Sequence, residues 1–233
     1  LSDMHKKFAR IPLSTLVQPH VRLAENGVVV YPYLETALKE EASTLSQFKS
    51  TRAVFLKPDG KNYAQGEKIV QKDLAESLKK IGKTYGEDFY SGSIARAISK
   101  STDGHISLSD LKSYRVKWRE PVRGSFKGYE VVSMPPPSSG GVHVIEILNL
   151  LENENLAKPG FQSKEANLKI ANAMRFAFLD RARYMGDPDF VKVPIRTLIS
   201  KSYADSIRRS DAWANNRKGD ADTFSKNWPL LPE

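Results

Sequence analysis

The chain has no cysteine among its 233 residues. This excludes disulfide bonds, a thiol nucleophile and cysteine-bound metal, but it leaves the compartment open because secreted bacterial chains can also lack cysteine. Long apolar runs are absent too, and none approaches the roughly 20 residues that a membrane-spanning helix needs. The first residues, LSDMHKKFAR, are charged and lack the apolar stretch of a signal peptide. We therefore expect no membrane span.

Basic residues are in excess, and the formal net charge is +9. A nucleic-acid partner is one explanation, but no RNA-recognition motif, zinc-finger spacing or leucine zipper accompanies the basic groups. These groups are interleaved with acids or separated by loops; they comprise Lys79, Lys80 and Lys83, then Arg115, Lys117, Arg119, Arg123 and Lys127, then Arg208, Arg209, Arg217 and Lys218. We expect a solvated surface that favours solubility, with no nucleic acid bound.

The hydrophobic content of 40% is high enough for a globular protein with a sizeable core. We predict a helix-rich α+β chain that forms a single domain or part of one. Hydrophobic periodicity predicts a helical front over residues 11–113, a β-hairpin over 115–134 and a helical back over 138–210. A loose C-terminal tail is expected over residues 211–233.

Glycines and a proline mark the expected ends of several elements. Asn26-Gly27 predicts the end of one helix, and the segment 82–86 predicts a break between two others. The dipeptide Lys127-Gly128 falls where the hairpin needs its turn. Pro121 interrupts the first half of this hairpin, so we expect an edge strand or a bulged one there.

The segment MPPPSSGG, residues 134–141, connects the second strand to a strongly apolar run. The prolines forbid a helix until they end, and a serine is then a natural N-cap. The two glycines allow another backbone or a ligand to come close. Along residues 142–151 every third residue is polar, namely His143, Glu146 and Asn149. We therefore predict a mostly buried helix.

Three interpretations of this elbow remain open. A serine nucleophile would resemble the α/β-hydrolase elbow, but that motif is G-x-S-x-G, whereas the glycines here follow the serines. An anion such as a carboxylate could bind the free N–H groups at the helix start, although the lysine of a P-loop is missing. Capping combined with tight packing of strand on helix is the interpretation we favour. The candidate substrate-binding residues are Ser138, Ser139, Gly140 and Gly141.

A second candidate cluster lies near the end of a helix predicted over residues 163–185. One face of this helix carries Ile170, Met174, Ala177 and Arg181. An arginine on an apolar face needs a partner, because breaking a buried ion pair costs on the order of 3 to 5 kcal/mol. The nearest carboxylates are Asp187 and Asp189. We therefore assign Arg181 a structural pairing and expect Arg181→Ala to lower thermal stability.

The same two aspartates could in principle bind a metal. However, the D-P-D sequence shows no third ligand. Asp187-Pro188 is more typical of a turn that fixes the end of the helix. We therefore expect neither a metal nor a cofactor.

Two long blocks resemble the γ-glutamyltranspeptidase family. The first is GYEVVSMPPPSSGGVHVIEILNLLE, residues 128–152, and the second is DRARYMGDPDFVKVP, residues 180–194, at the distance expected in the family. The resemblance continues more weakly through FYSGSIARAI, ISLSDLKSY and LVQPHVRLAENGVVV. It covers roughly residues 11–207, and two blocks in the right order make it specific.

The resemblance implies an N-terminal nucleophile hydrolase with an αββα sandwich, which is incomplete in this chain. Such precursors cut themselves into a large and a small subunit and expose a threonine that attacks γ-glutamyl amides such as glutathione. The glutamyl group then passes to water, an amino acid or a peptide. By resemblance the protein is periplasmic or secreted, and the chain is the C-terminal part of the large subunit.

The family's catalytic residues do not map onto this chain. The nucleophile heads a threonine-rich segment, and Thr223, which is followed by Phe-Ser, lacks that motif. The paired serines that contact substrate in the family belong to another segment, so Ser138 and Ser139 do not inherit that role. We expect no catalytic residue here. The expected partners are the small subunit with its threonine and the N-terminal part of the large subunit.

An alternative is a truncated, non-catalytic homologue that serves as a binding or assembly module. If the chain is a fragment, a piece cut from a sandwich exposes apolar surface that the missing strands would cover. The isolated chain is then expected to form dimers or to rearrange its packing.

Overall fold

The computed structural model describes residues 1–215. The chain divides into two compact units, residues 1–117 and residues 118–233. This division lies close to the border that we expected between the helical front and the hairpin. The tail expected from residue 211 onward begins with a short helix, α15 (Asp211–Asn215). The remainder of that tail, which includes Thr223, lies outside the described residues.

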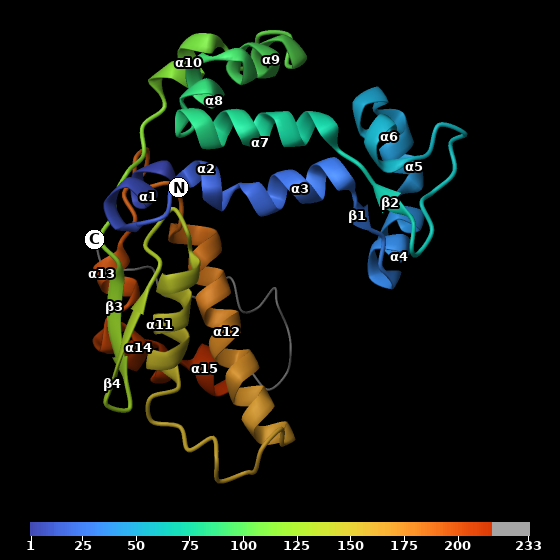
Figure 1. Cartoon of the computed structure of the whole chain (residues 1–233). Helices are drawn as coiled ribbons and strands as arrows, with labels where there is room; N and C mark the ends of the chain where they lie inside the picture. Colours follow the sequence, from blue (N-terminus) through green and yellow to red (C-terminus); the bar gives the residue numbers. More distant parts are fainter. Residues whose placement is uncertain (216–233) are drawn as a thin grey trace. The chain divides into compact units, whose positions relative to one another are not determined.

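Unit 1 is mostly helical, and its first half is shown in blue in Figure 1. Its helices are α1 (Ser2–Phe8), α2 (Leu13–Leu16), α3 (Gln18–Asn26), α4 (Pro32–Glu40), α5 (Ala42–Gln47), α6 (Lys49–Phe55), α7 (Lys72–Thr84), α8 (Glu87–Ser91), α9 (Ser93–Ser101) and α10 (Leu108–Ser113). Strands β1 (Val28–Val29) and β2 (Lys68–Ile69) pair antiparallel, with Val28 opposite Ile69. We did not predict these strands, because two residues are too few to show a period.

Two small cores hold unit 1 together. Helices α3 and α7 run side by side (Figure 1), and Val21 and Ala24 pack there with Ala75. Val30, Leu38 and Ile69 form the second core beside the small sheet.

The predicted helix ends in unit 1 are confirmed, with one difference. Helix α3 ends at Asn26, and Gly27 follows with φ +86°, a value that favours glycine. Helix α7 ends within the predicted segment, before Tyr85 and Gly86, which both have positive φ. Two helices follow this break where we expected one, because the Asp88 carboxylate accepts the N–H groups at the start of α9.

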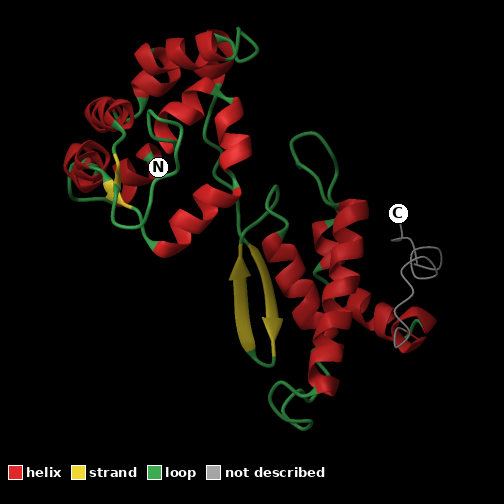
Figure 2. Cartoon of the chain, turned by 90° about the vertical axis from the view of Figure 1, so that its right-hand side faces the viewer, coloured by secondary structure: helices red, strands yellow, loops and turns green. Residues whose placement is uncertain are grey.

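Unit 2 begins with the predicted hairpin, drawn as the pair of long yellow strands in Figure 2. Strands β3 (Val122–Phe126) and β4 (Tyr129–Ser133) pair antiparallel, and Lys127 and Gly128 form the turn with φ of +47° and +88°. The turn prediction is confirmed. The predicted start at residue 115 was wrong, because β3 begins only after Pro121, which has no N–H group to donate to a partner strand.

The rest of unit 2 is helical. Its helices are α11 (Gly140–Leu150), α12 (Lys164–Tyr184), α13 (Ile195–Leu198), α14 (Lys201–Arg208) and α15. The long helix α12 matches the predicted helix over residues 163–185. The Ser163 hydroxyl caps it by accepting the N–H of Ala166 at 3.2 Å.

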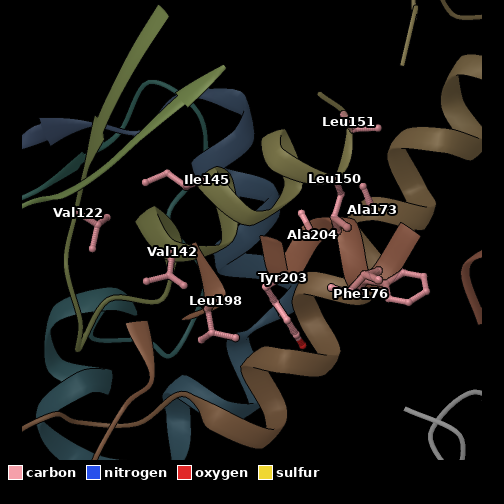
Figure 3. Packing of buried hydrophobic residues seen from close by; sticks show 11 residues of the cluster. Val122, Val142, Ile145, Leu150, Leu151, Ala173, Phe176, Leu198, Tyr203 and Ala204 are labelled. Atoms are coloured by element: carbon pink, nitrogen blue, oxygen red, sulfur yellow. The ribbon is translucent and has the colours of Figure 1, made fainter. Parts of the chain in front are cut away.

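Helix α11 lies at the centre of unit 2. Figure 3 shows side chains from β3, α11, α12, α13 and α14 meeting around it. The buried residues of this core are Val122, Val142, Ile145, Leu150, Leu151, Ala173, Phe176, Leu198, Tyr203, Ala204 and Ile207. Because α11 is covered on several sides, the prediction of a mostly buried helix is confirmed.

Candidate functional site

The elbow before α11 holds the four residues that we considered for substrate binding. Helix α11 begins at Gly140, so Ser139 occupies the N-cap position, but its side chain makes no capping hydrogen bond. The backbone of Ser139 is already in the α region (φ −77°, ψ −17°), whereas a capping side chain usually needs an extended backbone. The hydroxyl of Ser138 accepts the N–H of Gly140 at 3.3 Å. The position of the cap was therefore predicted correctly, but the hydrogen bond was not.

The two glycines of the elbow differ sharply in their surroundings. A Cβ atom at Gly141 would lie 2.2 Å from the carbonyl oxygen of Met134 and 2.8 Å from Cγ2 of Val122. Only glycine therefore allows α11 to pack this closely against the chain leaving β4. A Cβ atom at Gly140 would meet only the Ser138 hydroxyl, at 3.5 Å. Tight packing thus explains Gly141 and leaves Gly140 unconstrained.

A serine nucleophile needs a base within hydrogen-bond reach. The backbone N–H of His143 donates to the Ser139 carbonyl at 3.1 Å, but among the described residues no hydrogen bond joins the imidazole to either serine hydroxyl, and its Nε2 atom is buried without a partner. The imidazole instead stacks on the Phe178 ring, with centroids 5.8 Å apart and planes at 3°. Burial, together with the positive charge of Arg181, lowers the pKa of His143. The elbow geometry therefore favours a packing role over nucleophilic catalysis.

Two buried carboxyl groups, one from α11 and one from α12, lie close together inside unit 2. Glu146 is 1% exposed and Asp180 of α12 is fully buried. Burial, with a further contribution from the neighbouring Asp180, raises the pKa of Glu146 to about 10. Glu146 is therefore protonated at neutral pH. The Tyr203 hydroxyl donates to Oδ2 of Asp180 at 2.8 Å.

This carboxyl cluster was not predicted from the sequence. The polar residues of α11 were visible at every third position, but nothing in the sequence showed that Asp180 lies beside Glu146. Because both groups are closed off from solvent, a substrate cannot reach them. We interpret the cluster as structural.

The predicted pairing of Arg181 was wrong. The buried face of α12 carries Phe176, Ala177 and Asp180, and Arg181, the next residue along, is exposed. Its guanidinium lies 5.9 Å from the centroid of the Phe178 ring. Asp189 instead forms an ion pair with Arg119 at 2.7 Å. Arg181 therefore does not compensate a buried charge.

The turn after α12 forms as expected. The carbonyl of Asp187 accepts the N–H of Phe190 at 3.0 Å, and its Oδ1 atom accepts the N–H of Asp189 at 3.0 Å. Within the described part of the chain, no three histidine or carboxylate side chains are close enough to hold a metal ion. None of the helices between residues 1 and 215 has the length and apolarity to cross a bilayer.

Three of the residues singled out from the sequence line one cavity. Its volume is about 400 Å³, and it lies between the elbow and the C-terminal end of α12. The lining residues are Pro137, Ser139, Phe178, Arg181, Ala182, Met185, Gly186 and Asp187. The structure thus brings Ser139, Arg181 and Asp187 together at this cavity. The other candidates, Ser138, Gly140, Gly141 and Asp189, are not part of its wall.

The sequence is similar to one family model and to several known proteins. The family model described as gamma-glutamyltranspeptidase matches residues 1–222. A glutathione hydrolase proenzyme from Escherichia coli (strain K12) is 42% identical over 205 residues, which is 86% of this chain and 35% of the relative. An acylase ACY 1 proenzyme from Pseudomonas sp. (strain SE83) is also 42% identical, over 87% of this chain and 37% of the relative. The chain thus spans about a third of these curated relatives.

Solved structures give the same result for the fold. The γ-glutamyltranspeptidase of Helicobacter pylori has a TM-score of 0.85 and 42% identity, covering 88% of this chain and 60% of that one. A cephalosporin acylase from Bacillus halodurans has a TM-score of 0.80 and 26% identity, covering 90% of this chain and 40% of that one. These matches confirm the expected fold class, and the family match extends beyond the predicted residues 11–207. The chain belongs to the γ-glutamyltranspeptidase family.

Proposed function

We propose that this chain is the C-terminal part of the large subunit of an enzyme that cleaves γ-glutamyl amides such as glutathione. The observation that carries this proposal is the 42% identity to the glutathione hydrolase proenzyme of Escherichia coli over 86% of the chain. The word proenzyme in that name supports processing of a precursor. By the same resemblance we place the protein in the periplasm or outside the cell.

The chemistry comes from a threonine outside these 233 residues. Its hydroxyl attacks the γ-carbonyl of the substrate, the amine leaves, and water or an amino acid then takes the glutamyl group from the ester. Two features of unit 2 support an outside nucleophile. The elbow serines have no hydrogen-bonded base among the described residues, and the carboxyl groups of Glu146 and Asp180 are sealed from solvent. The small subunit and the N-terminal part of the large subunit are the partners in this proposal.

A second candidate function is the hydrolysis of amides whose acyl group is not γ-glutamyl. The acylase ACY 1 proenzyme is as similar in sequence as the glutathione hydrolase, at 42%. The cephalosporin acylase also shares the fold at a TM-score of 0.80. Both candidates cleave an amide bond, so they differ in the acyl group that the site accepts.

Release of p-nitroaniline from γ-glutamyl-p-nitroanilide tests the proposal. The 233-residue chain alone should release none, and the protein encoded by the complete reading frame should release it. A Ser138→Ala/Ser139→Ala variant of the complete protein should retain the activity. The matched control, Thr223→Ala, should retain it too.

Other outcomes would each point to a different account. Release by the isolated chain that disappears in the double serine variant would overturn the proposal. Cleavage of a cephalosporin side chain without cleavage of the γ-glutamyl substrate would favour the acylase alternative. A reading frame that stops after Glu233 would favour a non-catalytic binding or assembly module.

A further inference from the structure

The cavity between the elbow and the end of α12 has apolar walls and two oppositely charged groups. Phe178 and Met185 supply apolar surface, whereas Arg181 and Asp187 supply the charges. Ser139, whose side chain can donate a hydrogen bond, is also part of the wall. The volume of about 400 Å³ lies within the range of small-molecule sites, roughly 300 to 1,000 Å³.

The cation of this cavity is available to a ligand. Among the described residues, no ion pair joins Arg181 to a carboxylate, and Asp189 pairs with Arg119. The guanidinium stays near the Phe178 ring, at 5.9 Å from its centroid. A planar guanidinium with two N–H edges is well suited to bind a carboxylate.

The carboxylate of Asp187 is held in place by a hydrogen bond. Among the described residues, it forms no ion pair with a basic side chain. Asp187 lies in the turn after α12, where its Oδ1 atom accepts the backbone N–H of Asp189 at 3.0 Å. This bond fixes the side chain and leaves the Oδ2 atom for another donor. Arg181 and Asp187 therefore line one cavity without pairing with each other.

The residues beside these two charges add no further charge. His143 stacks on Phe178, and burial holds its pKa below the ordinary value, so this imidazole is neutral at pH 7. The remaining wall residues, Pro137, Ala182 and Gly186, are uncharged. The cavity thus presents one positive group, one negative group and an apolar surface.

We propose that this cavity binds a free α-amino acid with an apolar side chain. The ligand carboxylate pairs with Arg181 and accepts from the Ser139 hydroxyl. The ligand ammonium group pairs with Asp187, and the side chain rests on Phe178 and Met185. This proposal concerns binding alone and does not depend on the enzymatic activity proposed above.

Isothermal titration calorimetry of the 233-residue chain tests the site with L-leucine and two analogues. N-acetyl-L-leucine lacks the ammonium group, and L-leucinamide lacks the carboxylate. We expect L-leucine to bind and each analogue to bind at least tenfold more weakly. Arg181→Ala should abolish detectable binding, whereas the matched control Arg209→Ala, an exposed arginine of the same unit, should leave it unchanged.

The Asp187→Asn variant separates the two charge contacts. Its side-chain oxygen still accepts the N–H of Asp189, so the turn is retained, but the negative charge is lost. We expect this variant to bind L-leucine and N-acetyl-L-leucine equally. Absence of L-leucine binding to the unmodified chain would overturn the proposal, as would full binding by Arg181→Ala. Circular dichroism establishes that each variant has the fold of the parent chain.

Discussion

At the scale of single residues, the most unusual feature is the pair of carboxyl groups of Glu146 and Asp180 inside unit 2. A folded-state pKa of about 10 means that folded Glu146 keeps its proton at pH values where the unfolded chain has lost it. The folded state then binds more protons than the unfolded state, so the free energy of unfolding falls as pH rises. The fall begins near the ordinary value of 4.5 and ends near 10.

Glu146→Gln should remove this pH dependence, because glutamine keeps the shape and carries no charge. We expect the variant to melt above the parent chain at pH 9 and close to it at pH 4, with an intermediate gain at neutral pH. Thermal unfolding followed by circular dichroism at the three pH values measures this difference. Glu165→Gln, which changes an exposed glutamate of α12, is the control. A gain that is the same at every pH would contradict the assigned protonation.

The two elbow glycines allow a matched comparison. Gly141→Ala places a methyl group 2.2 Å from the Met134 carbonyl oxygen, so the backbone at Met134 or in α11 must move. We expect a loss of about 1 to 3 kcal/mol, as for other overpacked sites. Gly140→Ala meets open space and should be neutral or slightly stabilising. Urea unfolding midpoints compare the two variants, and equal effects would contradict the packing role of Gly141.

At the scale of elements, the sequence predicted the limits of α12 better than its orientation. Its length follows from the Ser163 cap and a continuous helical pattern. Its buried face was misassigned by one residue, since Asp180 is buried and Arg181 is exposed. A partly apolar pattern does not determine which of two neighbouring charged residues points inward. That choice depends on Tyr203 and Glu146, which come from other helices.

The exposure of Arg181 removes the loss of stability expected from the sequence alone. Arg181→Ala should change the free energy of unfolding by no more than about 0.5 kcal/mol, as is usual for surface positions. Phe176→Ala, at a fully buried position of the same helix, should cost roughly 3 to 5 kcal/mol. Chemical denaturation of both variants measures the contrast. A large loss in Arg181→Ala would restore the original pairing hypothesis.

The hairpin and the elbow show what local sequence can determine. The Lys127-Gly128 turn and the helix start at Gly140 follow from backbone preferences of the residues involved, and both are observed. The cavity and the buried carboxyl pair could not be predicted. Each depends on residues about 35 to 50 positions apart that meet only after α11 and α12 have packed.

At the scale of the whole molecule, unit 2 exposes several apolar side chains on its two central helices. Leu168 and Met174 are exposed on α12, and Val144 is exposed on α11. Exposed apolar surface of this kind marks contact sites. A chain that spans about a third of its relatives is expected to have such a surface where the rest of the protein would pack.

The isolated 233-residue chain should therefore self-associate. Sedimentation velocity should show a sedimentation coefficient that rises with protein concentration. Leu168→Glu/Met174→Glu should shift the chain toward a monomer, because two charges would have to be buried in the contact. A compact monomer for the unmodified chain at all concentrations would contradict this expectation.

The central claim is that the chain belongs to an amide-cleaving enzyme of the γ-glutamyltranspeptidase family whose nucleophile lies outside these residues. The most direct measurement is to label the protein from the complete reading frame with an electrophilic glutamate analogue and locate the label by peptide mass spectrometry. The account predicts one labelled threonine beyond residue 233 and no label on this chain. A label on Ser138 or Ser139 would contradict it.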